Sequence, residues 1–70
     1  QSFAGPVADR RGDIYAAQGK RDEARAEYQK AWTALGTGSE YRRLVEIKLN
    51  AVGVDPKTLD APAAPAKTNP

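Results

Sequence analysis

The chain has 70 residues with eleven basic and nine acidic side chains, a net charge of +2, and therefore forms at most one small domain with a marginal core. It contains no cysteine and no histidine, which excludes disulfides and thiol chemistry and removes the commonest general base and transition-metal ligand. No run of about 20 apolar residues is present, so this piece is not expected to span a membrane. Because methionine is absent even at position 1, we expect a processed product or a fragment.

The first predicted element is a helix over residues 6–18. Pro6 suits the first helical position, where a missing N–H does no harm. Gly12 lies mid-helix, where glycine costs about 1 kcal/mol relative to alanine, so we expect another backbone to pass close to it. Gly19 tolerates the left-handed conformation and is expected to end the helix. The expected apolar stripe comprises Val7, Ala8, Ile14, Tyr15 and Ala17.

A second helix is predicted over residues 21–35. Asp22 and Glu23 suit its first turn, because the helix dipole favours negative charge there. Its apolar residues share one face by their spacing: Ala24, Tyr28, Ala31, Trp32 and Leu35. The other face is expected to carry Glu23, Glu27 and Lys30. Two ion pairs at i,i+3 spacing are expected: Asp22 with Arg25, and Glu27 with Lys30.

A third helix is predicted over residues 40–52, after the break at residues 36–38. Ser39 is a good N-cap, and Gly53 is expected to end the helix. Its apolar residues are Tyr41, Leu44, Val45, Leu49 and Val52.

The composition changes after the third helix, since four of the five prolines lie beyond residue 55. Residues 1–53 are therefore predicted to form the helical fragment. Residues 54–70 are predicted to be a Pro/Ala-rich tail, extended and largely disordered. Val54 and Leu59 are the tail residues placed to contact the third helix.

The glycine and aromatic spacing resembles a tetratricopeptide repeat, a helix–turn–helix of about 34 residues, with residues 5–38 as one repeat. Gly12 is followed three residues later by Tyr15 and twelve later by Ala24, and Tyr28 comes four after Ala24. The expected helix-packing motif comprises Gly12, Tyr15, Ala24, Tyr28, Ala31 and Trp32. The chain departs from the consensus tryptophan, leucine and proline at Ala8, Arg11 and Gly36.

Four segments carry a closer resemblance: residues 8–14, 17–20, 24–28 and 44–49. They are similar to the C-terminal end of the tetratricopeptide-like ancillary subunit family of the bacterial SecYEG translocon. That resemblance implies a membrane anchor outside this sequence and a location on the periplasmic side of the inner membrane. It also implies a chaperone-handover role in protein transport, with translocon subunits, periplasmic chaperones and the parent's own repeats as partners. The third helix would be the capping helix of the array.

By the same resemblance, the first helix of each repeat lines a concave groove. The expected partner-binding groove comprises Asp9, Asp13, Ala17, Arg43, Ile47 and Asn50; the alternative is an ordinary solvated face. Asp9 and Asp13 lie one turn apart, as a paired-carboxylate catalytic site or a hard-cation site requires. However, two short helices offer little pocket and two carboxylates too few ligands. We expect no enzyme activity, cofactor or metal.

Basic residues gather around the first turn and in a smaller group on the third helix: Arg10, Arg11, Lys20, Arg21 and Arg25, then Arg42 and Arg43. Nucleic-acid binding would require a denser stripe and exposed aromatics, so no nucleic acid is expected. Attraction to an anionic membrane surface or an acidic partner stays open. Tyr15, Tyr28 and Trp32 are expected in the core; Trp32 or Tyr41, if left exposed by a missing next helix, would be an association hot spot.

The sequence thus predicts an all-α fold: a tetratricopeptide-like hairpin, a capping helix and a tail. The predicted function is protein–protein interaction, as the C-terminal part of a scaffold. Two alternatives stay open. One is a cytoplasmic repeat adaptor, and the other is an oligomerisation element that associates with copies of itself.

Overall fold

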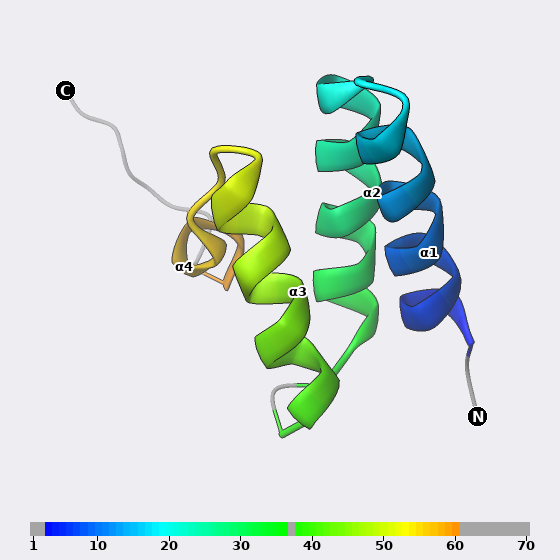
Figure 1. The fold of residues 1–70 in the computed structure, drawn as a ribbon. Helices are drawn as coiled ribbons and strands as arrows, with labels where there is room; N and C mark the ends of the chain where they lie inside the picture. Colours follow the sequence, from blue (N-terminus) through cyan, green and yellow to red (C-terminus); the bar gives the residue numbers. More distant parts are fainter. Residues whose placement is uncertain (1–2, 37, 61–70) are drawn as a thin grey trace, which may run out of the picture.

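The computed structural model describes residues 3–36 and 38–60, and within these ranges the chain is helical with no strand. The helices are α1 (Ala4–Ala17), α2 (Arg21–Ala34), α3 (Glu40–Ala51) and α4 (Pro56–Asp60). Figure 1 shows the three long helices side by side, with α2 between α1 and α3. The short α4 packs against α2 and α3. The predicted all-α fold is confirmed. None of the helices in the described ranges combines the length and apolar character that crossing a membrane demands.

Helix α1 begins at Ala4, two residues earlier than predicted, so Pro6 is its third residue rather than its first. The helix tolerates this position, because N–H groups of the first turn have no intrahelical acceptor. The earlier start brings Gly5 close to Leu35, because a Cβ on Gly5 would lie 2.7 Å from Cδ2 of Leu35. The additional turn is therefore packed closely against the end of α2.

Glycine ends α1 and α3, as predicted. Gly19 has φ 76° and Gly53 has φ 86°, a conformation that side chains with a Cβ rarely adopt. The amide of Lys20 donates to the carbonyl of Tyr15 at 2.9 Å, and the same pattern recurs after Gly53. These bonds satisfy carbonyl groups that the helix end would otherwise leave unpaired.

The start of α3 also follows the prediction, whereas α2 is one residue shorter than expected. Leu35 is extended with ψ 140°, so α2 ends at Ala34. The Ser39 hydroxyl accepts a hydrogen bond from the Tyr41 amide at 3.1 Å. Ser39 thus caps α3 as expected.

The α1–α2 interface depends on small residues. A Cβ on Gly12 would lie 2.5 Å from Cδ1 and 2.9 Å from Cζ of Tyr28, so the predicted close approach at Gly12 is confirmed. The neighbour is an aromatic ring, however, and not the backbone we expected. Ala24 and Ala31 are fully buried, and Trp32 is buried in the same core. Tyr15 is half-buried against the edge of that core.

The predicted apolar stripe of α1 is wrong at its two large aliphatic residues. Val7 and Ile14 are 47% and 48% exposed. Helix α1 instead turns Gly5, Ala8 and Gly12 toward the core. Two helices that approach closely need small residues between them, so the bulkier apolar side chains lie outside.

The burial of three further side chains differs from what the sequence predicted. Glu27 and Arg42 are buried, and Leu44 is 48% exposed. Helix α2 is covered by helices on both sides, so its buried face is wide enough to include Glu27. The two predicted i,i+3 ion pairs are present, at 3.2 Å for Asp22–Arg25 and 3.3 Å for Glu27–Lys30.

The start of the predicted tail is also different. Residues 56–60 form the short helix α4, although residues 54–70 were predicted to be an extended tail. The Asp55 carboxylate accepts from the Lys57 amide at 3.0 Å, which is the geometry of an N-cap followed by proline at the first position.

Two apolar residues fix this segment to the rest of the fold. Val54 and Leu59 are half-buried against the core, as the sequence suggested. Residues 61–70 of the predicted tail lie outside the described residues.

Candidate functional site

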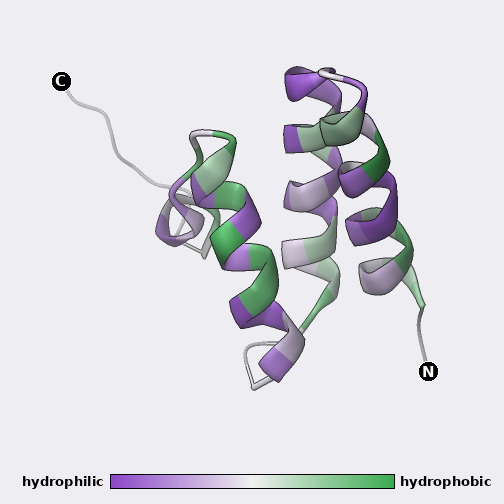
Figure 2. Cartoon of the chain, in the orientation of Figure 1, coloured by the Kyte–Doolittle hydropathy of each residue, from purple (hydrophilic) through white to green (hydrophobic). Residues whose placement is uncertain are grey.

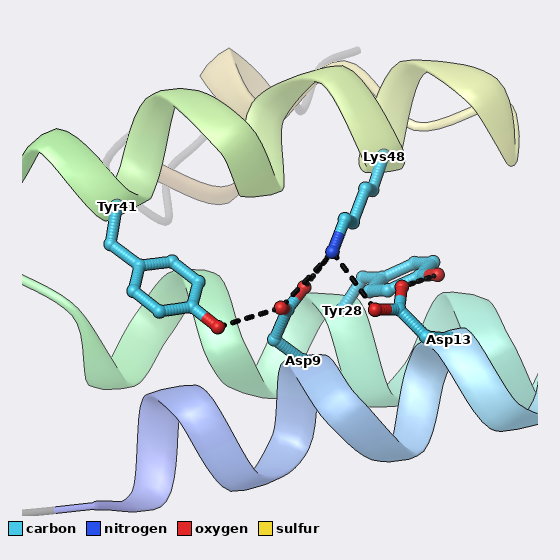
Figure 3. Close-up of polar contacts among 5 residues, drawn as sticks. All are labelled: Asp9, Asp13, Tyr28, Tyr41 and Lys48. Atoms are coloured by element: carbon cyan, nitrogen blue, oxygen red, sulfur yellow. Dashed lines mark hydrogen bonds and ion pairs between the residues drawn. The ribbon is translucent and has the colours of Figure 1, made fainter.

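Five polar side chains from three helices meet on the side of α1 that faces α3 (Figure 3). We call them the polar cluster: Asp9 and Asp13 of α1, Tyr28 of α2, and Tyr41 and Lys48 of α3. The two acids are four residues apart and therefore lie one above the other on α1. Tyr41 and Lys48 are seven residues apart, about two turns, so they also share one side of their helix.

Lys48 is the centre of the cluster. Its Nζ lies 3.0 Å from Oδ1 and 3.1 Å from Oδ2 of Asp9. The same nitrogen lies 3.0 Å from Oδ2 of Asp13. One ammonium group thus bridges both carboxylates and ties α3 to α1.

Two tyrosine hydroxyls complete the hydrogen bonding of the acids. The Tyr41 hydroxyl donates to Oδ2 of Asp9 at 2.8 Å. The Tyr28 hydroxyl donates to Oδ1 of Asp13 at 2.7 Å. Every carboxylate oxygen of the pair therefore accepts at least one hydrogen bond.

The cluster runs from the interior to the surface. The side chain of Asp9 is 5% exposed and that of Lys48 is 22% exposed, whereas that of Asp13 is 44% exposed. A carboxylate as buried as Asp9 is costly unless it is paired and hydrogen-bonded. Lys48 and Tyr41 supply that pairing.

The surroundings shift several pKa values. Burial alone would raise the pKa of Asp13, but the hydrogen bonds from Tyr28 and Lys48 and the charges of Lys48 and Arg10 hold it below its usual 3.8. Burial would lower the pKa of Lys48, yet Asp9 and Asp13 together raise it above its usual 10.5. The cluster thus favours the charged forms of Asp13 and Lys48.

The two tyrosines are held in the neutral form. Burial, followed by the hydrogen bond to Asp13, raises the pKa of Tyr28 far above its usual 10.0. The hydrogen bond to Asp9, followed by burial, raises the pKa of Tyr41. Neutral hydroxyls are the donors that this arrangement needs, so the cluster is internally consistent as a structural contact between three helices.

The predicted groove residues do not form one surface. Asp9 is buried, so the expectation that it faces an open groove is wrong: its oxygens are occupied by Lys48 and Tyr41. Asp13 is partly exposed, and the remaining predicted groove residues are exposed: Ala17, Arg43, Ile47 and Asn50.

The α3 residues that contact the acids are Tyr41 and Lys48, which the sequence reasoning missed. Arg43 and Asn50 lie roughly half a turn around α3 from them at 100° per residue. Leu44 is three residues after Tyr41 and four before Lys48, so this exposed leucine borders the polar cluster. The seven-residue spacing of Tyr41 and Lys48 was the available signal.

A second contact explains the burial of Arg42. Its guanidinium lies 3.8 Å from the centroid of the Trp32 ring, and its Nε donates to the Trp32 carbonyl at 3.3 Å. An open cavity of about 850 Å³ lies beside this pair at the junction of α2 and α3. Trp32 is thus a core residue and not an exposed hot spot. In the smaller basic group, Arg42 and Arg43, Arg42 is buried and Arg43 is exposed.

Within the described ranges, no group of three or more acidic side chains is placed to hold a metal ion. The polar cluster also directs its hydrogen bonds inward, from one helix to another. Its geometry therefore supports a role in holding α3 against the hairpin.

Comparison with known proteins agrees with the helix-packing motif. A family model described as a tetratricopeptide repeat-like domain matches residues 1–54. Searches of curated proteins and of solved structures find no match. Such repeats are typically non-catalytic scaffolds for protein–protein interaction. The close contact of Gly12 with Tyr28, the buried Ala24 and the matched family model together show that the chain belongs to the tetratricopeptide repeat-like domain family.

Proposed function

We propose that the chain is the C-terminal end of a repeat scaffold that binds protein partners on the face shared by α1 and α3. The observation that carries the proposal is the exposure of Leu44 and Ile47, at 48% and 61%, on a helix rich in charged residues. Large apolar side chains held on a rigid, exposed helix are typical anchors of protein interfaces.

The exposure of each side chain supports the following choice of contact residues. Leu44 and Ile47 provide the apolar contact, while Asp13 and Ala17 provide the polar and small surface on α1. Asp9 acts indirectly, because it positions Lys48 and hence α3. Arg43 and Asn50 belong to the outer edge of the surface.

The resemblance carried by residues 8–14, 17–20, 24–28 and 44–49 supports a more specific role. In this proposal the scaffold acts on the periplasmic side of the bacterial inner membrane. There it contacts Sec translocon subunits and helps pass secreted chains to periplasmic chaperones. The α1–α3 face would be the contact surface.

Site-specific photo-crosslinking tests the proposal. A photoreactive amino acid at position 47, in the protein produced in bacterial cells, is expected to capture translocon subunits and periplasmic chaperones. The matched control is position 33, since Thr33 is exposed on α2. Capture of cytoplasmic partners alone at position 47 would support the cytoplasmic adaptor instead. Equal yields at positions 33 and 47 would contradict the proposed surface.

A variant complements the crosslinking. Ile47→Asp places a charge in the apolar contact and is expected to abolish pull-down of translocon subunits while leaving the helical circular dichroism unchanged. Thr33→Asp is the control and should retain binding. Replacing Asp9 is unsuitable for this purpose, because it would leave Lys48 without its main partner and destabilise the fold.

A further inference from the structure

A small hollow lies where the α1–α2 turn meets the end of α3. Its volume is about 220 Å³, and six residues line it: Ala16, Gly19, Arg21, Ala24, Ala51 and Val52. Figure 1 shows the turn and the end of α3 at the same end of the molecule. The hollow exists because most of its lining residues are glycine or alanine, which leave the space between the helices unfilled.

The hollow has an apolar floor and a basic rim. Ala24 is fully buried and Val52 is 8% exposed, whereas Ala16, Arg21 and Ala51 are exposed at the opening. In Figure 2 the end of α3 is coloured as apolar and the start of α2 as hydrophilic. A group that enters the hollow therefore meets methyl groups below it and a guanidinium beside it.

The guanidinium of Arg21 is placed to meet such a group. Its Nη2 lies 3.6 Å from the position that a Cβ on Gly53 would take, so the side chain reaches from the start of α2 toward the end of α3. Within residues 3–36 and 38–60, no carboxylate lies within ion-pair distance of Arg21. A ligand in the hollow does not have to displace an ion pair to reach it.

The hollow continues the apolar row of α3. Ala51 follows Leu44 by seven residues and Ile47 by four, so the three lie on one side of the helix. On α1, Ala16 comes about one turn after Asp13, whose carboxylate is bound by α3. A preceding repeat stacked against the opposite side of α1 would leave this opening uncovered.

We propose that the hollow binds one aromatic side chain of the partner segment that lies along Leu44 and Ile47. The inference rests on the function proposed above, because that segment is the one held by the α1–α3 face. An apolar cavity of about 150 Å³ takes up a benzene molecule, so the ring of a phenylalanine fits the hollow. The guanidinium of Arg21 is attracted to the face of such a ring.

Other side chains match the hollow less completely. An aliphatic side chain covers the apolar floor, but it removes water from Arg21 without offering the guanidinium an interaction in return. A carboxylate pairs with Arg21 but leaves the methyl groups of Ala24 and Val52 without an apolar contact. An aromatic ring provides both contacts, since it is apolar and its face carries partial negative charge.

The geometry of α3 also specifies a spacing in the partner. Ile47 and Ala51 are about 6 Å apart along the helix at 1.5 Å per residue. Residues i and i+2 of an extended chain lie on the same side of it and are about 6.6 Å apart. An extended segment with an aliphatic residue two positions from an aromatic one therefore contacts Ile47 and the hollow together. Unfolded secreted chains expose side chains of this kind, which folded proteins bury.

Binding of matched peptides tests the inference. The two peptides are identical serine-rich chains with leucine at one position and, two residues later, either phenylalanine or cyclohexylalanine. The two side chains are alike in size, but only phenylalanine has the π face that attracts a guanidinium. Titrations followed by NMR should show the phenylalanine peptide binding about threefold more tightly. In Arg21→Gln the two peptides should bind equally.

A second variant closes the hollow. Ala51→Leu places a larger side chain at the opening and should weaken binding of the phenylalanine peptide about tenfold. The matched control is Ala26→Leu, because Ala26 is also exposed on a helix but does not line the hollow. Both variants should keep the helical circular dichroism of the unchanged chain.

Either of two results would overturn the inference. One is equal binding of the phenylalanine and cyclohexylalanine peptides to the unchanged chain. The other is equal binding of the phenylalanine peptide to Ala51→Leu and Ala26→Leu. In both cases the proposed function stands if position 47 still captures translocon subunits. Conversely, if position 47 captures no such subunit while the peptides and variants behave as expected, the translocon role fails and the hollow remains an aromatic-binding site.

Discussion

Helix α1 is joined to its two neighbours by different kinds of contact. Against α2 it presents Gly5, Ala8 and Gly12, and the fit depends mainly on side-chain volume, with the hydrogen bond from Tyr28 to Asp13 beside it. Against α3 it presents Asp9 and Asp13, and the contact is made of charge and hydrogen bonds. The stability of the α1–α2 contact should therefore respond to side-chain size, and that of the α1–α3 contact to charge and pH.

Tyr28 belongs to both contacts. Its ring packs on Gly12, and its hydroxyl donates to Asp13 at 2.7 Å. The two interfaces are therefore distinct in chemistry but joined through one side chain. Four changes test how far they can be separated, from the largest expected effect to the smallest.

Gly12→Leu should have the largest effect. The new side chain would occupy the space of the Tyr28 ring, and overpacking of this kind costs about 3 kcal/mol, which is a large share of the stability of so small a domain. We expect loss of helical circular dichroism at room temperature. Gly36→Leu is the control, since a Cβ there meets nothing within 4 Å. If the two variants melt at the same temperature, the volume-based account of the α1–α2 contact is wrong.

Lys48→Met should destabilise the polar interface. It removes the cation that is bonded to the buried Asp9, at a cost of about 2 kcal/mol, below the range for fully buried pairs because Lys48 is partly exposed. Urea unfolding measures the change. Lys30→Met is the matched control: its 65% exposed side chain pairs with Glu27, and such surface pairs contribute about 0.5 kcal/mol or less. Equal losses in both variants would contradict the special role of Lys48.

Alkaline pH should weaken the same interface. The pKa of Lys48 is raised in the folded chain, so its contribution is fully present below the unfolded value of about 10.5 and is lost as pH rises through the folded value. The raised pKa of Tyr28 acts in the same direction above its unfolded value of 10.0. We expect the free energy of unfolding to fall above about pH 10. In Lys48→Met this fall should be smaller; an identical alkaline profile would assign the loss to other groups.

Tyr41→Phe should have the smallest effect. It removes one hydrogen bond to Asp9, while both bonds from Lys48 to that carboxylate remain. A single hydrogen bond of this kind is worth about 1 kcal/mol. Chemical denaturation should show a small shift with an unchanged slope. A loss as large as that of Lys48→Met would mean that the tyrosine, and not the lysine, holds α3 in place.

The sequence predicted those features that short-range chemistry controls. Gly19, Gly53 and Ser39 act through hydrogen bonds to residues close by in the chain, so local patterns were enough. The close approach of α2 at Gly12 was predicted because the repeat spacing encodes it, although the neighbour is the Tyr28 ring and not the expected backbone.

The remaining features depend on packing at a distance. Val7 and Ile14 were assigned to the core because hydrophobicity ranks them above glycine, whereas close helix contact requires the smaller residue. Lys48 lies 39 residues from Asp9, and no local spacing connects them. The assignment of Asp9 to an open groove failed for the same reason.

The positions of the two glycines that end α1 and α3 indicate where a second repeat lies in the chain. Positions 19 and 53 differ by 34 residues, the period of a tetratricopeptide repeat. Helix α4 therefore starts close to where the second helix of a second repeat is due, but it has five residues where α2 has fourteen.

Repeat proteins are described by an intrinsic stability for each repeat and a coupling to its neighbour. Here the second repeat is a partial one, so its intrinsic stability is low, and its coupling runs through the apolar core that α3 shares with α2 and through Lys48 and Asp9. Unfolding should begin at this end, and hydrogen exchange should show α3 opening before the α1–α2 hairpin.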